Sequence, residues 1–265
     1  MISIIMISIV HIPEGIARNI VECIYYNYSA DFNITDITAP MLNPEIFFSF
    51  GSSFKIGEFL FSQKNCSHSA VFGHHHIAPT VQSKGEHKTM GILLKPWAIN
   101  LLTFVDGRKI KSATIESKLF ALGNLFSKQQ SVFKELNAQD ALLQLETLFT
   151  DKVVFAEQSP TFETIYKLVD NMALSEKNIN HLVELSGVSA KTFIGVFKKN
   201  MQVSPLRFIH YKAILASTAS LKYSNMPIVK IALDNGFYDQ SHYNKIFKSF
   251  FKISPNAYRQ MYQNG

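Results

Sequence analysis

Residues 234–259 read DNGFYDQSHYNKIFKSFFKISPNAYR, and the pattern of this stretch occurs a second time 50 residues upstream. The shared positions are Phe197-Lys198 and Ser204-Pro205 in the first copy, and Phe247-Lys248 and Ser254-Pro255 in the second. Each copy predicts a short helix, a turn that contains glycine, and a second helix with a polar, basic face. A duplicated helix-turn-helix in a basic segment is typical of proteins that bind DNA.

The positive charge of the chain is concentrated in the half that contains this repeat. Residues 160–265 carry 13 Lys and Arg against 6 Asp and Glu, a net charge of +7. Residues 1–159 carry 13 against 14, a net charge of −1. This asymmetry favours a polyanionic partner for the C-terminal half.

The chain is long enough for two domains, because its 265 residues exceed a typical single domain of about 100–200 residues. Hydrophobic residues make up 47% and charged residues 17%, which indicates folded domains rather than a disordered chain. We expect an α+β protein with a β-rich sensor or dimerisation domain at 1–155 and an all-α double helix-turn-helix domain at 156–265. The segment 151–161, which contains Ser159-Pro160, is the predicted connection.

The N-terminal half begins with short runs rich in Ile, Val, Phe and Tyr, which predict the strands of a small sheet or barrel. The runs occupy residues 20–28, 32–38, 46–50, 54–62, 70–76 and 90–94. After Trp97 the apolar spacing becomes helical, at 119–126 and again at 142–149. These amphipathic helices pack either on the sheet or on a second subunit.

The opening stretch MISIIMISIV predicts a paired or buried β-strand rather than a signal peptide, since no Lys or Arg precedes Arg18. No run reaches the roughly 18 apolar residues of a membrane span, so we expect no membrane contact. Cys23 and Cys66 are too few for a disulfide scaffold in a chain of this length and are interpreted as free thiols. A cytoplasmic location follows as the expectation.

A cluster of histidines is the one feature of the N-terminal half that suggests chemistry. His74, His75 and His76 are consecutive, with His68 and His87 nearby. Imidazoles are common transition-metal ligands, but adjacent strand residues point to opposite faces, so only alternate members of the triplet share a site. No acidic residue stands at ligand spacing, and no catalytic motif is present. We therefore expect no metal, no cofactor and no catalytic residues.

The first helix-turn-helix is predicted from its caps and its apolar spacing. Asn178 is the expected N-cap of the first helix, Gly187 the turn, and Ser189 the N-cap of the second helix. Phe193, Val196 and Phe197 form the buried face of that second helix. The predicted DNA-binding residues on its outward face are Ser189, Ala190, Lys191, Thr192, Ile194, Gly195 and Lys198.

A longer helix from Pro205 to about residue 221 joins the two copies, and its length of roughly 25 Å suits a spacer between two recognition helices. In the second copy Asn235-Gly236 forms the turn and Asp239 caps the recognition helix. Tyr243, Ile246 and Phe247 form its buried face. The predicted DNA-binding residues are Asp239, Gln240, Ser241, His242, Asn244, Lys245 and Lys248.

Residues 179–259 resemble the double helix-turn-helix module of the AraC-type (AraC/XylS) transcription regulators. The family signature GF-x-x-x-SHF-x-R-x-F-K with SP-x-x-YR stands here as Gly236-Phe237, Ser241-His242-Tyr243, Lys245, Phe247-Lys248, Ser254-Pro255 and Tyr258-Arg259. The resemblance implies that the outer faces of 189–198 and 239–248 contact bases and phosphates. Gly195 stands where the family usually has Arg, and Ile194 where a polar residue is common. We therefore expect the second recognition helix to supply most of the base specificity.

The N-terminal half resembles, more loosely, the β-rich domain of uncharacterised function that precedes this module in some family members. The matching stretches are 39–51, 72–79 and 90–102, with GILLKP at 91–96. The resemblance implies a domain that binds a small effector or dimerises.

The sequence thus predicts a cytoplasmic, sequence-specific transcription regulator that is controlled through its N-terminal domain and is not an enzyme. An activator is one expectation, and the sequence leaves activator versus repressor open. Double-stranded DNA and RNA polymerase are the expected partners, with a small-molecule effector and a homodimer as open alternatives. One competing interpretation is an architectural or adaptor protein that binds DNA with little sequence preference. Another is a small-molecule enzyme whose histidine-bearing barrel is tethered to DNA.

Overall fold

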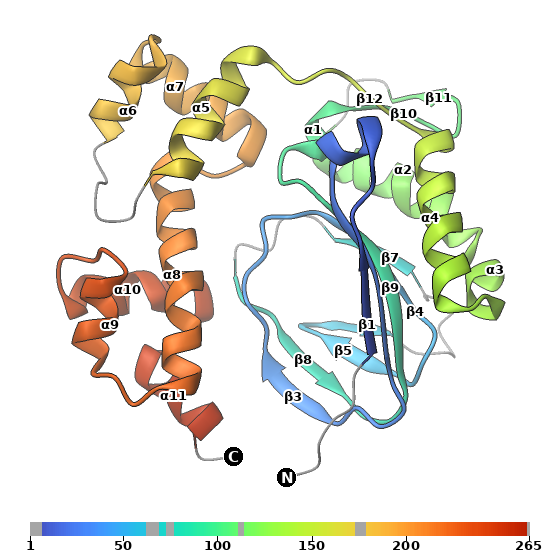
Figure 1. Cartoon of the computed structure of the whole chain (residues 1–265), viewed down its shortest axis with the longest axis horizontal. Helices are drawn as coiled ribbons and strands as arrows, with labels where there is room; N and C mark the ends of the chain where they lie inside the picture. Colours follow the sequence, from blue (N-terminus) through green and yellow to red (C-terminus); the bar gives the residue numbers. More distant parts are fainter. Residues whose placement is uncertain (1–6, 62–68, 73–76, 111–113, 173–178, 264–265) are drawn as a thin grey trace. The chain divides into compact units, whose positions relative to one another are not determined.

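The computed structural model describes residues 7–61, 69–72, 77–110, 114–172 and 179–263 (Figure 1). The chain divides into two compact units, one made of residues up to Glu157 apart from 76–78, and one made of Gln158 onward together with 76–78. The first unit combines sheets with helices and the second is helical, which confirms the α+β class. The boundary expected at 155/156 stays a prediction.

The first unit is built on a five-stranded antiparallel sheet with the strand order β1-β2-β9-β4-β7. Its strands are β1 (Ile7–His11), β2 (Val21–Ser29), β9 (His87–Leu94), β4 (Glu45–Ser49) and β7 (Ser69–Phe72). A short 3-10 helix, Gly15–Asn19, connects β1 to β2. The strand predicted at the start of the chain is confirmed for Ile7–His11, whereas residues 1–6 lie outside the described residues.

A second antiparallel sheet has the order β3-β8-β5-β6, and a third, smaller one has the order β11-β10-β12. Their strands are β3 (Ile34–Ile37), β8 (Thr80–Ser83), β5 (Phe54–Ile56), β6 (Phe59–Phe61), β11 (Arg108–Lys109), β10 (Leu102–Val105) and β12 (Val153–Phe155).

The described helices of the first unit are α1 (Ala98–Leu101), α2 (Ile115–Ser127), α3 (Gln130–Glu135) and α4 (Ala138–Lys152). Alternate residues of each strand point to opposite faces of the sheet. Ile46 and Phe48 on β4 therefore join the main core with Phe126 of α2 and Leu145 of α4. Phe47 between them faces the other way and packs with residues of the second sheet. The helices thus cover one face of the large sheet and the second sheet covers the other.

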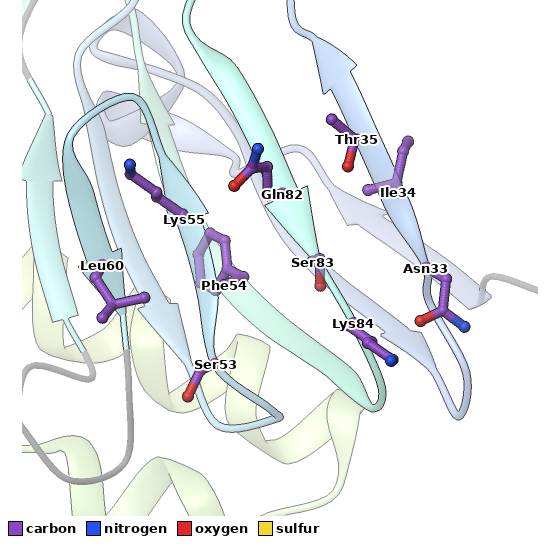
Figure 2. A pocket seen from close by; sticks show the side chains of 10 residues that line it. All are labelled: Asn33, Ile34, Thr35, Ser53, Phe54, Lys55, Leu60, Gln82, Ser83 and Lys84. Atoms are coloured by element: carbon purple, nitrogen blue, oxygen red, sulfur yellow. The ribbon is translucent and has the colours of Figure 1, made fainter.

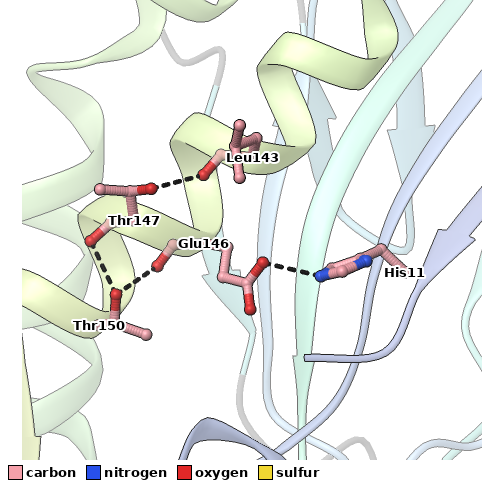
Figure 3. Close-up of polar contacts among 5 residues, drawn as sticks. All are labelled: His11, Leu143, Glu146, Thr147 and Thr150. Atoms are coloured by element: carbon pink, nitrogen blue, oxygen red, sulfur yellow. Dashed lines mark hydrogen bonds and ion pairs between the residues drawn. The ribbon is translucent and has the colours of Figure 1, made fainter. Parts of the chain in front are cut away.

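The edge strand β1 is tied to helix α4 by a polar contact (Figure 3). The Nε2 of His11 lies 2.7 Å from a carboxylate oxygen of Glu146. Because both side chains are partly exposed, water screens this contact and its effect on stability is small.

The structure corrects two expectations for the first unit and adds one strand that was not expected. The single strand expected at 54–62 is a hairpin, because Gly57, with φ +57°, lets the chain reverse between β5 and β6. The connection expected from residue 151 is shorter, since α4 continues to Lys152 and β12 then pairs with β10. Strand β8 was not expected, because its sequence TVQS contains one apolar residue.

The second unit contains seven helices among its described residues. They are α5 (Pro160–Asn171), α6 (Ile179–Ser186), α7 (Ala190–Met201), α8 (Pro205–Tyr223), α9 (Ile228–Asp234), α10 (Gln240–Phe251) and α11 (Pro255–Gln263). Helix α8 runs between the pair α6 and α7 and the pair α9 and α10 (Figure 1). Within the described residues, no helix has both the length and the apolar character needed to cross a bilayer.

Candidate nucleic-acid interface

The helices α7 and α10 begin and end in the same way, 50 residues apart. The side chain of Ser189 accepts a hydrogen bond from the backbone N–H of Thr192, and that of Asp239 accepts one from His242. Each therefore satisfies a free N–H group in the first turn, as the sequence predicts. Both helices end at a left-handed residue, Gln202 with φ +58° and Lys252 with φ +61°.

The buried faces of the two copies also correspond. Phe197 of α7 packs on Phe208 of α8 with ring centroids 5.6 Å apart and planes at 64°. Phe247 of α10 packs on Tyr258 of α11 at 5.5 Å and 68°. The repeat seen in the sequence is thus a repeat of side-chain packing, which fixes the rotation of each recognition helix.

The turns that precede the recognition helices differ in length. One residue, Val188, separates Gly187 from the N-cap in the first copy, whereas two, Phe237 and Tyr238, separate Gly236 from Asp239 in the second. Phe237 fills the core with 3% of its surface exposed, and Tyr238 is 88% exposed. Both turn glycines have positive φ angles, +68° and +74°, which favour glycine.

The outward face of α7 has the composition that the sequence indicates. All seven predicted residues, Ser189 through Lys198 on that face, are exposed. Ile194 is 42% exposed, and a Cβ added at Gly195 would meet nothing within 4 Å. The face therefore offers two lysines and two hydroxyls. Its middle carries the apolar side chain of Ile194 and, at Gly195, no side chain. Cations and hydroxyls suit phosphate contacts, while the middle of the face has little to pair with a base edge.

The outward face of α10 is richer in groups that pair with bases. Gln240, Ser241, Lys245 and Lys248 are exposed, as is the capping Asp239. Amide and cationic side chains of this kind make bidentate contacts to base edges in the major groove.

Two residues of this face are less exposed than the sequence suggested. His242 is half-buried, because its ring packs 5.5 Å from the rings of Phe237 and His210. Asn244 is also half-buried, and its Oδ1 is buried with no hydrogen-bond partner among the described residues. The amide nitrogen is therefore the polar atom of Asn244 that can contact DNA. The role of all fourteen residues in binding DNA stays a prediction.

One exposed residue at this surface was missed by the sequence reasoning. Tyr238 directly precedes Asp239, so its ring stands at the N-terminal end of α10. The available signal was the extra residue in the second turn, which places an aromatic side chain outside the core.

The remaining residues singled out in the sequence are histidines, the two cysteines and the N-cap candidate Asn178. Residues His68, His74, His75, His76, Cys66 and Asn178 lie outside the described residues. His87 packs against Phe32 and Phe54, and burial lowers its pKa. Cys23 is a free, half-buried thiol whose pKa is raised by burial. Among the described residues, no group of three or more His, Cys, Asp or Glu is arranged to hold a metal.

Comparison with known proteins places this surface in a known kind of domain. Residues 182–261 match the helix-turn-helix domain family. An uncharacterised HTH-type transcriptional regulator of Haemophilus influenzae is 28% identical over 115 residues, which are 43% of this chain and 39% of that protein. The multiple antibiotic resistance protein MarA of Escherichia coli is 28% identical over 105 residues, 40% of this chain and 83% of MarA.

The match to longer relatives is partial. The chain spans 39% of the length of the Haemophilus protein and 32% of the regulator MtrA of Neisseria gonorrhoeae. Among solved structures, ToxT of Vibrio cholerae aligns with 97% of this chain and 99% of its own, at 15% identity and a TM-score of 0.44.

Proposed function

We propose that this protein is a sequence-specific DNA-binding transcription regulator of the AraC/XylS type that is controlled through its N-terminal unit. The match of residues 182–261 to the helix-turn-helix domain family supports the proposal. The observation that carries the proposal is the outward face of α10. There Gln240, Ser241 and Lys245 stand exposed on a helix that its cap and core hold in a fixed rotation.

The two recognition helices have different tasks in this proposal. The lysines and hydroxyls of α7 bind phosphates, which fixes the position of the protein on the duplex. The side chains of α10 read base edges. Helix α8, with 19 residues and a length of about 28 Å, separates the two copies by a span suited to successive major grooves, which lie about 34 Å apart.

The N-terminal unit acts as the sensor or dimerisation domain. An effector that binds there, or a change in dimer state, shifts the protein between forms that bind DNA with different affinity. Contact with RNA polymerase makes the protein an activator, and the protein acts in the cytoplasm. The proposal assigns it no catalytic step.

A second candidate function is favoured by Ile194 and Gly195. A first helix with so little base-pairing capacity also suits an architectural protein that binds DNA with little sequence preference. Backbone contacts alone give an affinity that depends on salt and not on sequence.

Selection of binding sites from random duplex DNA by the full chain decides between the two. The selected duplex is then competed against a scrambled duplex of equal length and composition at one fixed salt concentration. A regulator prefers the selected duplex by about 10³-fold or more. A ratio near one contradicts sequence-specific regulation and supports the architectural alternative.

A further inference from the structure

A cavity of about 240 Å³ lies between the two larger sheets of the N-terminal unit. Its lining is mostly apolar and comes from both sheets, with Glu45 as the residue that ionises among those described. The main lining residues are Met41, Glu45, Phe47, Ile56, Phe72 and Val81. This combination of apolar walls and one polar group is the usual composition of a site for a small molecule.

The cavity has a structural origin in the small cluster on this face of the large sheet. Phe47, Phe54 and Phe72 are buried together, with rings 5.4 and 6.0 Å from that of Phe47. They pack strands β4 and β7 of the large sheet against β5 of the second sheet, and Phe47 and Phe72 also line the cavity.

Glu45 is held in place by a contact that crosses a strand. The hydroxyl of Tyr25 on β2 donates a hydrogen bond to Oε1 of Glu45 on β4, although β9 lies between these strands. Gly91 of β9 makes this contact feasible, because a Cβ there would lie 2.7 Å from the Tyr25 hydroxyl and 2.5 Å from the carbonyl oxygen of Ile46. Three residues on three strands thus fix the direction of one carboxylate.

The second oxygen of that carboxylate is the group that a ligand would meet. No hydrogen-bond partner of Glu45 Oε2 is found among the described residues, whereas Oε1 has Tyr25. Burial raises the pKa of Glu45, while the hydrogen bond from Tyr25 lowers it. Because burial disfavours the ionised form of Glu45, a cationic partner in the same cavity would stabilise its carboxylate.

A second, more open hollow of the same unit has a different chemistry (Figure 2). It measures about 770 Å³ and lies over β3, β8 and β5, where Lys55, Lys84 and Gln82 give it a polar and basic border. An anionic molecule would find its partners there and not beside Glu45.

From this arrangement we infer that the cavity beside Glu45 binds a small, mainly apolar molecule with a protonated amino group, whose ammonium pairs with Glu45 Oε2. The inference rests on the proposed function, since it names the class of effector that the N-terminal unit takes. Apolar walls bind the body of the molecule and the carboxylate selects its head group. A carboxylic acid of the same shape is rejected, because two anions would share one apolar cavity.

Three probes of one skeleton test the inference: 2-phenylethylamine, 2-phenylethanol and phenylacetate. Binding to the full chain is measured by calorimetry without DNA. We expect saturable binding of the amine, at least about tenfold tighter than that of the alcohol, and no saturation by the acid. Equal affinity for the amine and the acid, or no saturation by the amine at millimolar concentration, overturns the inference.

Variants assign the selectivity to one residue. Glu45→Gln keeps an acceptor for Tyr25 and removes the charge, so the affinity for the amine falls by about tenfold or more while that for the alcohol changes little. Glu22→Gln makes the same change at an exposed position of the same sheet and leaves all affinities unchanged. Unchanged amine affinity in Glu45→Gln contradicts the role of Glu45. Val81→Phe, which fills the cavity from β8, abolishes binding of both the amine and the alcohol.

The outcome is independent of the DNA experiment. Failure to bind amines leaves the selection of DNA sites untouched, and failure of DNA selection leaves the calorimetry valid. If both succeed, adding 2-phenylethylamine to the DNA competition measures whether the two units are coupled.

Discussion

The phenolic oxygen of Tyr243 on α10 lies 2.9 Å from the Oγ of Ser217 on α8 and donates a hydrogen bond to it inside the core of the second unit. Ser217 is fully buried and in turn donates to the carbonyl of Ile214. Burial raises the pKa of Tyr243 to about 12. The AraC-type signature has Phe where this chain has Tyr243, so the hydroxyl is an added polar group that requires this partner.

We predict that Ser217→Ala destabilises the second unit by about 1–3 kcal/mol, because it leaves the buried hydroxyl of Tyr243 unpaired. Tyr243→Phe costs about 0.5–1.5 kcal/mol. The double variant costs less than the sum, because both partners are then absent. Urea unfolding is followed by far-UV circular dichroism, which reports the secondary structure of both units. Fluorescence of Trp97, the single tryptophan, reports the first unit and serves as the internal control. Additive losses would show that the two side chains are not coupled.

Removing Lys245 and removing Lys198 should weaken DNA binding in different ways. Lys245→Ala lowers the preference for the selected duplex over its scrambled form, since a base contact is worth roughly 1–3 kcal/mol. Lys198→Ala weakens binding to both duplexes alike. It also reduces the slope of log affinity against log salt concentration by about one. Lys167→Ala, an exposed charge on α5 outside both helix-turn-helix pairs, is the control for net charge. Identical profiles for Lys245→Ala and Lys198→Ala would contradict the division of tasks between the helices.

Gly195 offers a gain-of-function experiment on α7. A Cβ fits there without contact, so Gly195→Ala stabilises the helix by up to about 1 kcal/mol with no effect on DNA selection. Gly195→Arg places a cation on the outward face and should tighten DNA binding, with a steeper salt dependence by about one counterion. If Arg at this position leaves affinity and salt slope unchanged, α7 does not face the duplex.

Glu45→Gln should stabilise the first unit at neutral pH. The folded state raises the pKa of Glu45 above its ordinary value of 4.5, so it binds the proton more tightly than the unfolded chain does. Stability is then greatest below that value and falls as the pH rises through the folded pKa. The higher stability of Glu45→Gln relative to the unsubstituted protein therefore appears above about pH 4.5 and vanishes below it. Urea unfolding followed by Trp97 fluorescence from pH 4 to 8 tests this, and an advantage independent of pH would contradict it.

Gly91→Ala should destabilise the first unit by about 1–3 kcal/mol, because its Cβ meets backbone and a packed ring. Gly123→Ala on α2 is the matched control, since its Cβ would lie at an ordinary 3.8 Å from Val71 Cγ2 and should be neutral or stabilising. Thermal unfolding of both variants measures the difference. Equal stability of the two variants would mean that β9 shifts to accommodate the new Cβ. The position of Tyr25 would then not depend on glycine at position 91.

The recognition helices were predictable because their signals are local. A cap such as Ser189 or Asp239, a turn glycine and the spacing of Phe193 and Phe197 all act within a few residues, and the structure has each of them where the sequence placed it. The half-burial of His242 was not predictable, since it depends on His210, a residue of another helix.

The β-rich unit was predictable in class and less so in detail. Strand β8 lacks an apolar pattern, and the pairing of Val81 with Asp36 and Ile56 is set by neighbours distant in the sequence. The contact between Tyr25 and Glu45 depends on the strand order β2-β9-β4, which alternation along one strand does not encode.

The extra residue before Asp239 restricts how the two copies can be exchanged in a chimera. From the N-caps Ser189 and Asp239 to Phe208 and Tyr258, corresponding residues of the two copies are always 50 positions apart. A graft that begins at the N-cap therefore keeps every outward side chain outward. A graft cut inside α6 and α9 is shifted by one position, which turns the transplanted face by about 100°. A designer who wishes to duplicate the stronger recognition helix must therefore begin at the cap. A cut inside α6 and α9 must instead join positions 49 residues apart, as Gly187 and Gly236 are.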